Sequence, residues 1–240
     1  AIGPWWGWVG AWGVLAGYVI LSYYAVVAGW SLLYFVRTVG WSVGGFPAGL
    51  QTGDLFVEVI GNGGLQFFLS GLFMVATVGV VYFGVHGGIE RVARVTLPIL
   101  FVILVLLVGS ALTMEGAGEA LVFIFRPNFS ELEPSGILEA LGHSFFTLSL
   151  GMGAMITYGS YVSPDRSLVS AAGAIVFLDT MIAIFATIIM FSVIFTVPGM
   201  DEQVSGSTAG MLFISLPQLF YEVVPFGVVL GPMFYLLVAL

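Results

Sequence analysis

The amino-acid sequence predicts an all-α membrane protein with about six transmembrane helices, and two observations support this fold class. Apolar residues occupy 60% of the 240 positions, whereas charged residues occupy only 8%. A soluble domain carries roughly 25% charged residues, so this composition cannot supply a water-exposed surface. The apolar residues also gather in runs of about 20, the length that one helix needs to cross the hydrocarbon core of a bilayer.

These runs define the predicted elements in chain order. We expect transmembrane helices at 5–36, 65–84, 95–113, 137–161, 168–197 and 224–240. Tryptophans at the start of the first span suit an interfacial belt. The segment 198–223 is predicted to be an extracellular loop, long enough to act as a lid, although a loop that dips into the headgroups explains it equally well. Because the last apolar run continues to Leu240, we expect the chain to be a piece of a longer protein.

The charged residues between the spans predict the orientation of the protein in a cell inner membrane, which it would cross several times. The two short loops, 84–94 and 162–167, hold Arg91, Arg94 and Arg166, whereas the longer loops hold most of the acidic residues. Arginine and lysine favour the cytoplasmic side of a membrane. Both short loops are therefore predicted to be cytoplasmic, so that the first span runs outward and the fourth runs inward.

The composition also excludes several classes of function. The absence of cysteine excludes disulfides, thiolate metal sites and a cysteine nucleophile. Two histidines do not make a histidine-rich metal cluster. A net charge of −8 argues against nucleic acid as a partner, because neutralising phosphates needs clustered basic residues. The lipid bilayer is the partner that the composition indicates.

The fourth predicted span, 137–161, carries small and hydroxylic residues in its centre, with a predicted break at Ser149–Gly153. Glycine weakens a helix, and unwound backbone at membrane depth is tolerated only where it lines a cavity. Broken helices of this kind carry substrate and ion sites in transporters. Ordinary helix packing through small residues, as at Gly13-x-x-x-Gly17, explains the same composition and stays open as the alternative.

Three polar side chains are predicted to lie near the middle of the membrane: Tyr24, Thr147 and Asp179. Thr147 lies about 15 Å into its span, at 1.5 Å per residue. A carboxylate at the bilayer centre costs about 2.5–3.5 kcal/mol, so Asp179 marks an ion or proton site unless it is a protonated structural residue. Asp and Thr supply the hard oxygen ligands that sodium prefers. His143, one turn from Thr147, is as consistent with a packed residue as with a proton carrier.

The stretch Phe145–Tyr161, FFTLSLGMGAMITYGSY, resembles the sixth transmembrane helix of the neurotransmitter:sodium symporters of the bacterial leucine-transporter type. The similarity continues at Gly88-Ile89-Glu90-Arg91, Arg126-Pro127-Asn128-Phe129, Tyr23-Tyr24 and Gly210–Pro217. It implies a partial leucine-transporter-type inverted-repeat fold. The chain would hold the third to seventh transmembrane helices and the start of the eighth.

The resemblance implies roles for residues of two spans. Tyr24 would bind the substrate carboxylate, and Phe146 would close over the substrate from outside. Thr147 would ligate a sodium ion, and Tyr161 would belong to the inner gate. Further residues would form the wall and the side-chain pocket of the substrate site: Ser149, Gly151, Met152, Ile20 and Val27.

Departures from the family pattern concern charge. Asp179 stands where the leucine transporter has Asn, Ala183 stands where it has Glu, and His143 replaces a Gln that helps to hold chloride in animal relatives. We therefore expect Asp179 and His143 to balance charge without chloride.

The predicted function is sodium-coupled symport of neutral, apolar or aromatic amino acids by alternating access in the whole protein, with the chain alone inactive. An ion channel and a membrane-embedded serine protease using Ser149 and His143 are the alternatives. These two residues are six apart on one helix, so they point to different faces. We therefore expect no enzyme.

Overall fold

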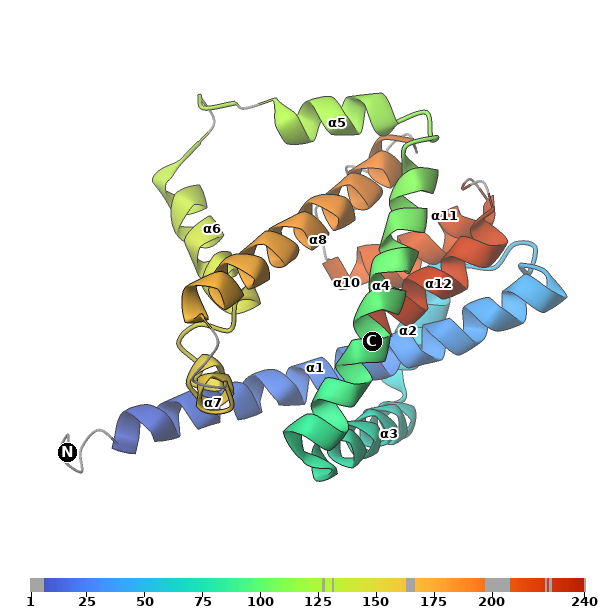
Figure 1. Ribbon diagram of the computed structural model, residues 1–240. Coiled ribbons are helices and arrows are strands. Elements are labelled where there is room, and N and C mark those ends of the chain that lie inside the picture. Colours follow the sequence, from blue (N-terminus) through green and yellow to red (C-terminus); the bar gives the residue numbers. More distant parts are fainter. Residues whose placement is uncertain are drawn as a thin grey trace. The chain divides into compact units, whose positions relative to one another are not determined.

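The computed structural model describes residues 7–126, 128–130, 132–162, 167–196, 208–222, 224 and 226–239. The described part of the chain is almost entirely helical and contains no strand (Figure 1). Four helices in it are long and apolar enough to cross a membrane: Gly7–Gly44, Gly63–Tyr82, Val85–Ala111 and Leu168–Thr196. The predicted all-α class is therefore confirmed.

The helical elements of the described residues follow one another along the chain. They are α1 (Gly7–Gly44), α2 (Thr52–Gly61), α3 (Gly63–Tyr82), the π-helical turn η2 (Val85–Ile89), α4 (Glu90–Ala111), α5 (Ala117–Phe125), α6 (Pro134–Thr147), α7 (Ala154–Ser160), α8 (Leu168–Thr196), α10 (Thr208–Gly210), the π-helical turn η3 (Met211–Ser215), α11 (Leu216–Glu222) and α12 (Gly227–Ala239). The predicted span 137–161 corresponds to two helices, α6 and α7, separated by six non-helical residues at 148–153.

The observed helices differ from the predicted spans mainly outside the apolar runs. α1 continues to Gly44 instead of ending at residue 36, because a helix need not stop where the hydrocarbon core stops. The segment between the first two spans contains α2, whose buried residues Thr52, Phe56 and Val59 recur at helical spacing. The predicted loop at 162–167 lies partly outside the described residues, at 163–166. The predicted lid at 198–223 does so at 198–207 and 223.

The chain divides into two compact units. The first contains residues 1–23 and 126–184, which include the start of α1, α6, α7 and most of α8. The second contains residues 24–125 and 185–240, which include the rest of α1, α2 to α5, the end of α8, and the elements from α10 to α12.

An aromatic cluster forms the core of the second unit. Tyr34 of α1, Phe213 of η3 and Tyr235 of α12 are fully buried. The ring of Phe213 lies 5.1 Å from the ring of Tyr34 and 5.7 Å from those of Trp30 and Phe56. Aromatic pairs at such distances add about 0.5–1.5 kcal/mol each beyond the area that they bury. The cluster therefore fixes η3 and α12 against α1.

Tyr221 of α11 provides a second attachment to α1 in the same unit. Its hydroxyl donates a hydrogen bond to the carbonyl oxygen of Thr38 (2.6 Å) and lies 2.9 Å from the Ser42 hydroxyl. Its ring stacks on Phe46 with the planes only 5° apart. Burial raises the pKa of the Tyr221 phenol above its ordinary value. The segment just before α12 is thus held to the end of α1 by both polar and aromatic contacts.

Candidate functional site: a broken helix between α6 and α7

The site begins where α6 ends. The helix ends in a turn in which the amide of Ser149 donates to the Phe146 carbonyl, three residues back (3.0 Å), and that of Leu150 to the Phe145 carbonyl, five residues back (2.8 Å). Helical bonding resumes only when the amide of Thr157 donates to the Gly153 carbonyl (3.1 Å). The carbonyl groups of residues 147–152 accept no backbone hydrogen bond from the described residues. The break therefore offers a short run of free oxygen ligands.

The sequence explains why the helix breaks at this point. Gly151 and Gly153 adopt φ values of +82° and +76°, in the left-handed region that glycine enters without a Cβ clash. Ser149 has a φ of +53°, which costs a non-glycine residue roughly 1–3 kcal/mol and is typical of functional sites. The predicted break at Ser149–Gly153 is confirmed, and it also includes Leu148.

The start of α1 packs directly against this break. A Cβ atom added to Gly13 would lie 3.2 Å from the Met152 carbonyl oxygen and 3.5 Å from the Gly153 nitrogen. Gly13 is buried, whereas a Cβ atom on Gly17 would meet nothing within 4 Å. The sequence signalled Gly13 only as a small residue of a packing motif. The structure adds it to the candidate site, because it lets the α1 backbone approach the unwound segment.

The predicted site residues of the broken helix lie together at the end of α6 and in the break. Phe146 and Thr147 are the last two residues of α6, and His143 lies one turn earlier. The Thr147 hydroxyl donates to the Ser144 carbonyl at 3.3 Å, a long bond that leaves its oxygen able to serve as a ligand. Tyr161 follows the last residue of α7 and is exposed.

Asp179 lies on α8, in the same unit, with its side chain partly buried. No hydrogen bond or ion pair joins its carboxylate to Thr147 or to any other residue in the described ranges. Those ranges also contain no group of three His, Asp or Glu residues that could hold a metal ion. Any sodium site would consist mainly of backbone carbonyl and hydroxyl oxygens, which hard cations accept. The free carbonyls of the break fit that requirement.

The remaining predicted residues share one helix. Ile20, Tyr24 and Val27 lie on α1 at spacings of four and three residues, so they project from one face. Ile20 and Val27 are partly buried, whereas Tyr24 is 47% exposed. Ile20, the first of these residues, lies about two helical turns after Gly13.

A membrane helix that is interrupted by glycines, with another helix packed on the interruption, is typical of transporters with discontinuous helices. A model of the sodium:neurotransmitter symporter family matches residues 54–240. The chain belongs to this family. The predicted family is thereby confirmed, and the expectation that the chain is not part of an enzyme is supported by its relatives, which are transporters.

Individual relatives agree with this assignment. An uncharacterized sodium-dependent transporter of Bacillus subtilis, YhdH, is 40% identical over 221 residues, which are 92% of this chain and 47% of YhdH. The mouse sodium-dependent neutral amino acid transporter B(0)AT3 is 33% identical over 147 residues, 60% of this chain and 24% of its own length.

Among solved structures, the crystal structure of MhsT in complex with L-phenylalanine matches with a TM-score of 0.86 and 41% identity. The match covers 99% of this chain and 53% of MhsT. This similarity confirms the predicted leucine-transporter-type fold. The chain spans about half the length of YhdH and of MhsT. It is part of a multi-pass membrane protein of a sodium-dependent transporter family.

Proposed function

We propose that the whole protein containing this chain is a sodium-coupled symporter of neutral, apolar or aromatic amino acids. The observation that carries this proposal is the break at residues 148–153. Its free carbonyl groups follow Thr147 in the chain, and Gly13 of α1 packs against one of them, that of Met152. Membership of the sodium:neurotransmitter symporter family supports it. Alternating access would expose the break first to one side of the membrane and then to the other.

The residues proposed for the substrate pocket favour an uncharged side chain. Ile20, Val27, Phe146 and Met152 are all apolar, and Met adapts its shape to different partners. The related MhsT was crystallised with L-phenylalanine, which agrees with an aromatic or apolar substrate. The Tyr24 hydroxyl would donate a hydrogen bond to the substrate carboxylate. Ser149, Gly151 and the rest of the unwound backbone would form the opposite wall.

The proposed cation site combines Thr147, the carbonyl groups of the break and Asp179. A zwitterionic substrate that enters with sodium brings net positive charge into a medium where uncompensated charge is costly. Asp179 would supply the compensating negative charge, so transport would not need chloride. His143 would take up a proton when sodium leaves and so keep the empty carrier neutral.

The gating roles rest on position in the broken helix. Phe146, at the end of α6, would close the substrate site on the outer side, and Tyr161, after α7, would belong to the inner gate. The exposure of Tyr161, 55%, leaves it accessible to a partner from the remaining half of the protein. Substitution of either residue by alanine should therefore impair occlusion more than it impairs folding.

Uptake of labelled phenylalanine or leucine into liposomes that contain the full-length protein tests the proposal. Uptake should follow an inward sodium gradient and vanish when potassium replaces sodium outside. Excess unlabelled tryptophan should compete, whereas excess glutamate or lysine should not. Uptake that is indifferent to the sodium gradient would contradict symport, and competition by glutamate or lysine would contradict the assigned substrate class.

A further inference from the structure

A groove lies on the second unit, between the end of α3 and the turn η2 that leads into α4. It encloses about 390 Å³. Its lining is apolar except for one arginine and consists of Ala76, Gly79, Val80, Phe83, Gly87, Gly88, Arg91 and Val92.

Glycines create this groove. A Cβ atom on Gly88 would collide with the Val80 carbonyl, so only glycine allows η2 to approach α3 so closely. A Cβ atom on Gly79 would meet nothing within 4 Å. At Gly79 the groove is therefore not filled by a side chain.

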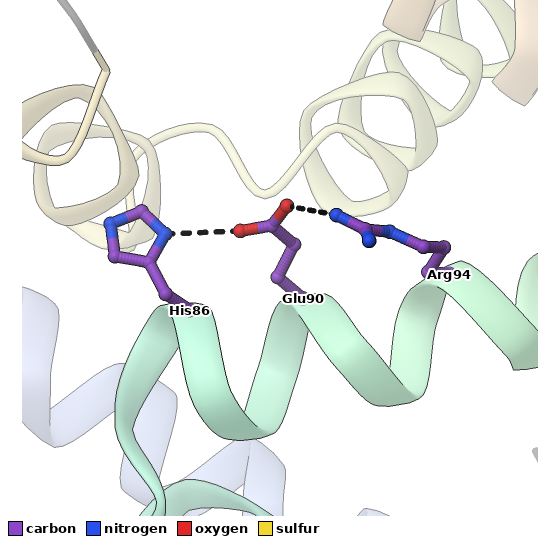
Figure 2. A network of polar contacts seen from close by, with 3 residues as sticks. All are labelled: His86, Glu90 and Arg94. Carbon is purple, nitrogen blue, oxygen red and sulfur yellow. Dashed lines mark hydrogen bonds and ion pairs between the residues drawn. The ribbon is translucent and has the colours of Figure 1, made fainter.

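The acidic residue next to Arg91, Glu90, is already paired with other side chains, so it does not pair with Arg91. Figure 2 shows Glu90 held between two partners on its own helix face: its carboxylate lies 3.0 Å from His86 Nδ1 and accepts a hydrogen bond from Arg94 at 2.8 Å. Arg91 is the next residue, about 100° further round the helix. Its side chain forms no hydrogen bond or ion pair within the described ranges. A guanidinium without an acidic partner thus lies at the edge of an apolar groove.

We propose that this groove binds an anionic phospholipid of the cytoplasmic leaflet, with the phosphate on Arg91 and an acyl chain along Ala76, Gly79 and Val80. Arginine binds phosphate oxygens through paired hydrogen bonds. Basic pockets between transmembrane helices on the cytoplasmic side are typical sites for anionic headgroups. The proposal rests on the predicted cytoplasmic position of residues 84–94 and is independent of what the protein transports.

Lipid retention by the full-length protein tests this site. The protein is exchanged into mixtures of phosphatidylglycerol and phosphatidylcholine, and the retained lipids are counted by native mass spectrometry. Arg91→Gln should weaken phosphatidylglycerol retention about fivefold, the effect expected of one arginine near a membrane surface. Arg91→Lys should keep most of it, because the charge remains. Arg126→Gln removes an equal charge outside the groove and should change nothing.

The apolar floor is tested separately. Gly79→Phe fills the groove and should reduce retention of this lipid, whereas Gly71→Phe, on the same helix with equally open space around it, should not. The proposal is overturned if Arg91→Gln retains phosphatidylglycerol like the unchanged protein, or if Arg126→Gln loses as much. Crosslinking of the Gly79→Cys variant to another part of the protein instead of to lipid would also overturn it.

Discussion

At the scale of single residues, the candidate site depends on Gly13 and Asp179, which composition alone does not distinguish from the other glycines and acidic residues. Gly13 is one of 33 glycines, yet its hydrogen atom faces the Met152 carbonyl at the break. Asp179 is one of 13 acidic residues, yet it lies in the middle of the apolar helix α8. Each position gives a prediction with a matched comparison.

Gly13→Val should destabilise the protein and lower substrate uptake. The added side chain meets the Met152 carbonyl at the break, and overpacking of this kind costs about 1–3 kcal/mol. Gly17→Val lies one turn further along α1, where a Cβ atom meets nothing within 4 Å, so it carries the same change in helix propensity without the collision. Thermal unfolding and uptake of both variants give the comparison. Equal losses in the two would show that the approach of α1 to the break is unimportant.

Asp179→Asn should abolish uptake or make it dependent on chloride. The substitution keeps the size of the side chain but removes the negative charge that we propose offsets bound sodium. Replacing chloride by gluconate should leave uptake by the unchanged protein as it was. Both measurements use full-length protein in liposomes. Chloride-dependent uptake by the unchanged protein, or normal uptake by Asp179→Asn without chloride, would contradict this account of charge balance.

At the scale of elements, the sequence predicted the broken helix better than it predicted the connections. The break was predictable because Gly151 and Gly153, which weaken a helix, lie at the centre of an apolar run. Unwound backbone at that depth is tolerated only where it lines a cavity. The positive φ of Ser149 was not predictable, since nothing in a serine signals a left-handed backbone. Helix α2 was missed because its apolar face is short and lies between two much stronger apolar runs.

Gly153→Ala should destabilise the protein because it forces a side chain into the left-handed region at φ +76°, at a cost of about 1–2 kcal/mol. Gly142→Ala, in the regular part of α6 and also surrounded by open space, should be neutral or stabilising by about 0.5–1 kcal/mol. Denaturation midpoints of the two variants measure the difference. If both substitutions stabilise, the left-handed conformation at residue 153 is wrong.

Tyr221→Phe should loosen α11 from the end of α1, with a loss of about 1 kcal/mol for the hydrogen bonds of the hydroxyl. The stacking on Phe46 would remain, so the segment should stay folded.

Because burial raises the pKa of the Tyr221 phenol, its neutral form is the stabilising one. That contribution is complete below the unfolded pKa of about 10 and is lost as the pH rises through the higher folded pKa. Tyr221→Phe should therefore reduce the loss of stability above pH 10, and an unchanged alkaline profile would contradict the contact.

At the scale of the whole molecule, composition and charge together describe a protein made for a bilayer. Long apolar side chains remain exposed on the membrane-length helices, as at Val14 (74%), Phe67 (83%) and Val169 (84%). These surfaces are available to contact lipid. The orientation in the membrane, in contrast, depends on very few residues, because the chain has only five arginines and no other cation that is always charged.

The predicted orientation can be tested by cysteine labelling, since this chain contains no cysteine of its own. Ser167→Cys reports on the short loop at 162–167, and Ser130→Cys reports on the longer loop before α6; both residues are exposed. Arginines prefer the cytoplasmic side, and the two short loops hold Arg91, Arg94 and Arg166. In intact cells, with any cysteine elsewhere in the protein replaced, a membrane-impermeant maleimide should therefore label Ser130→Cys at once. It should label Ser167→Cys only after the membrane is opened. Immediate labelling of Ser167→Cys with protection of Ser130→Cys would reverse the orientation and would also place the Arg91 groove in the outer leaflet.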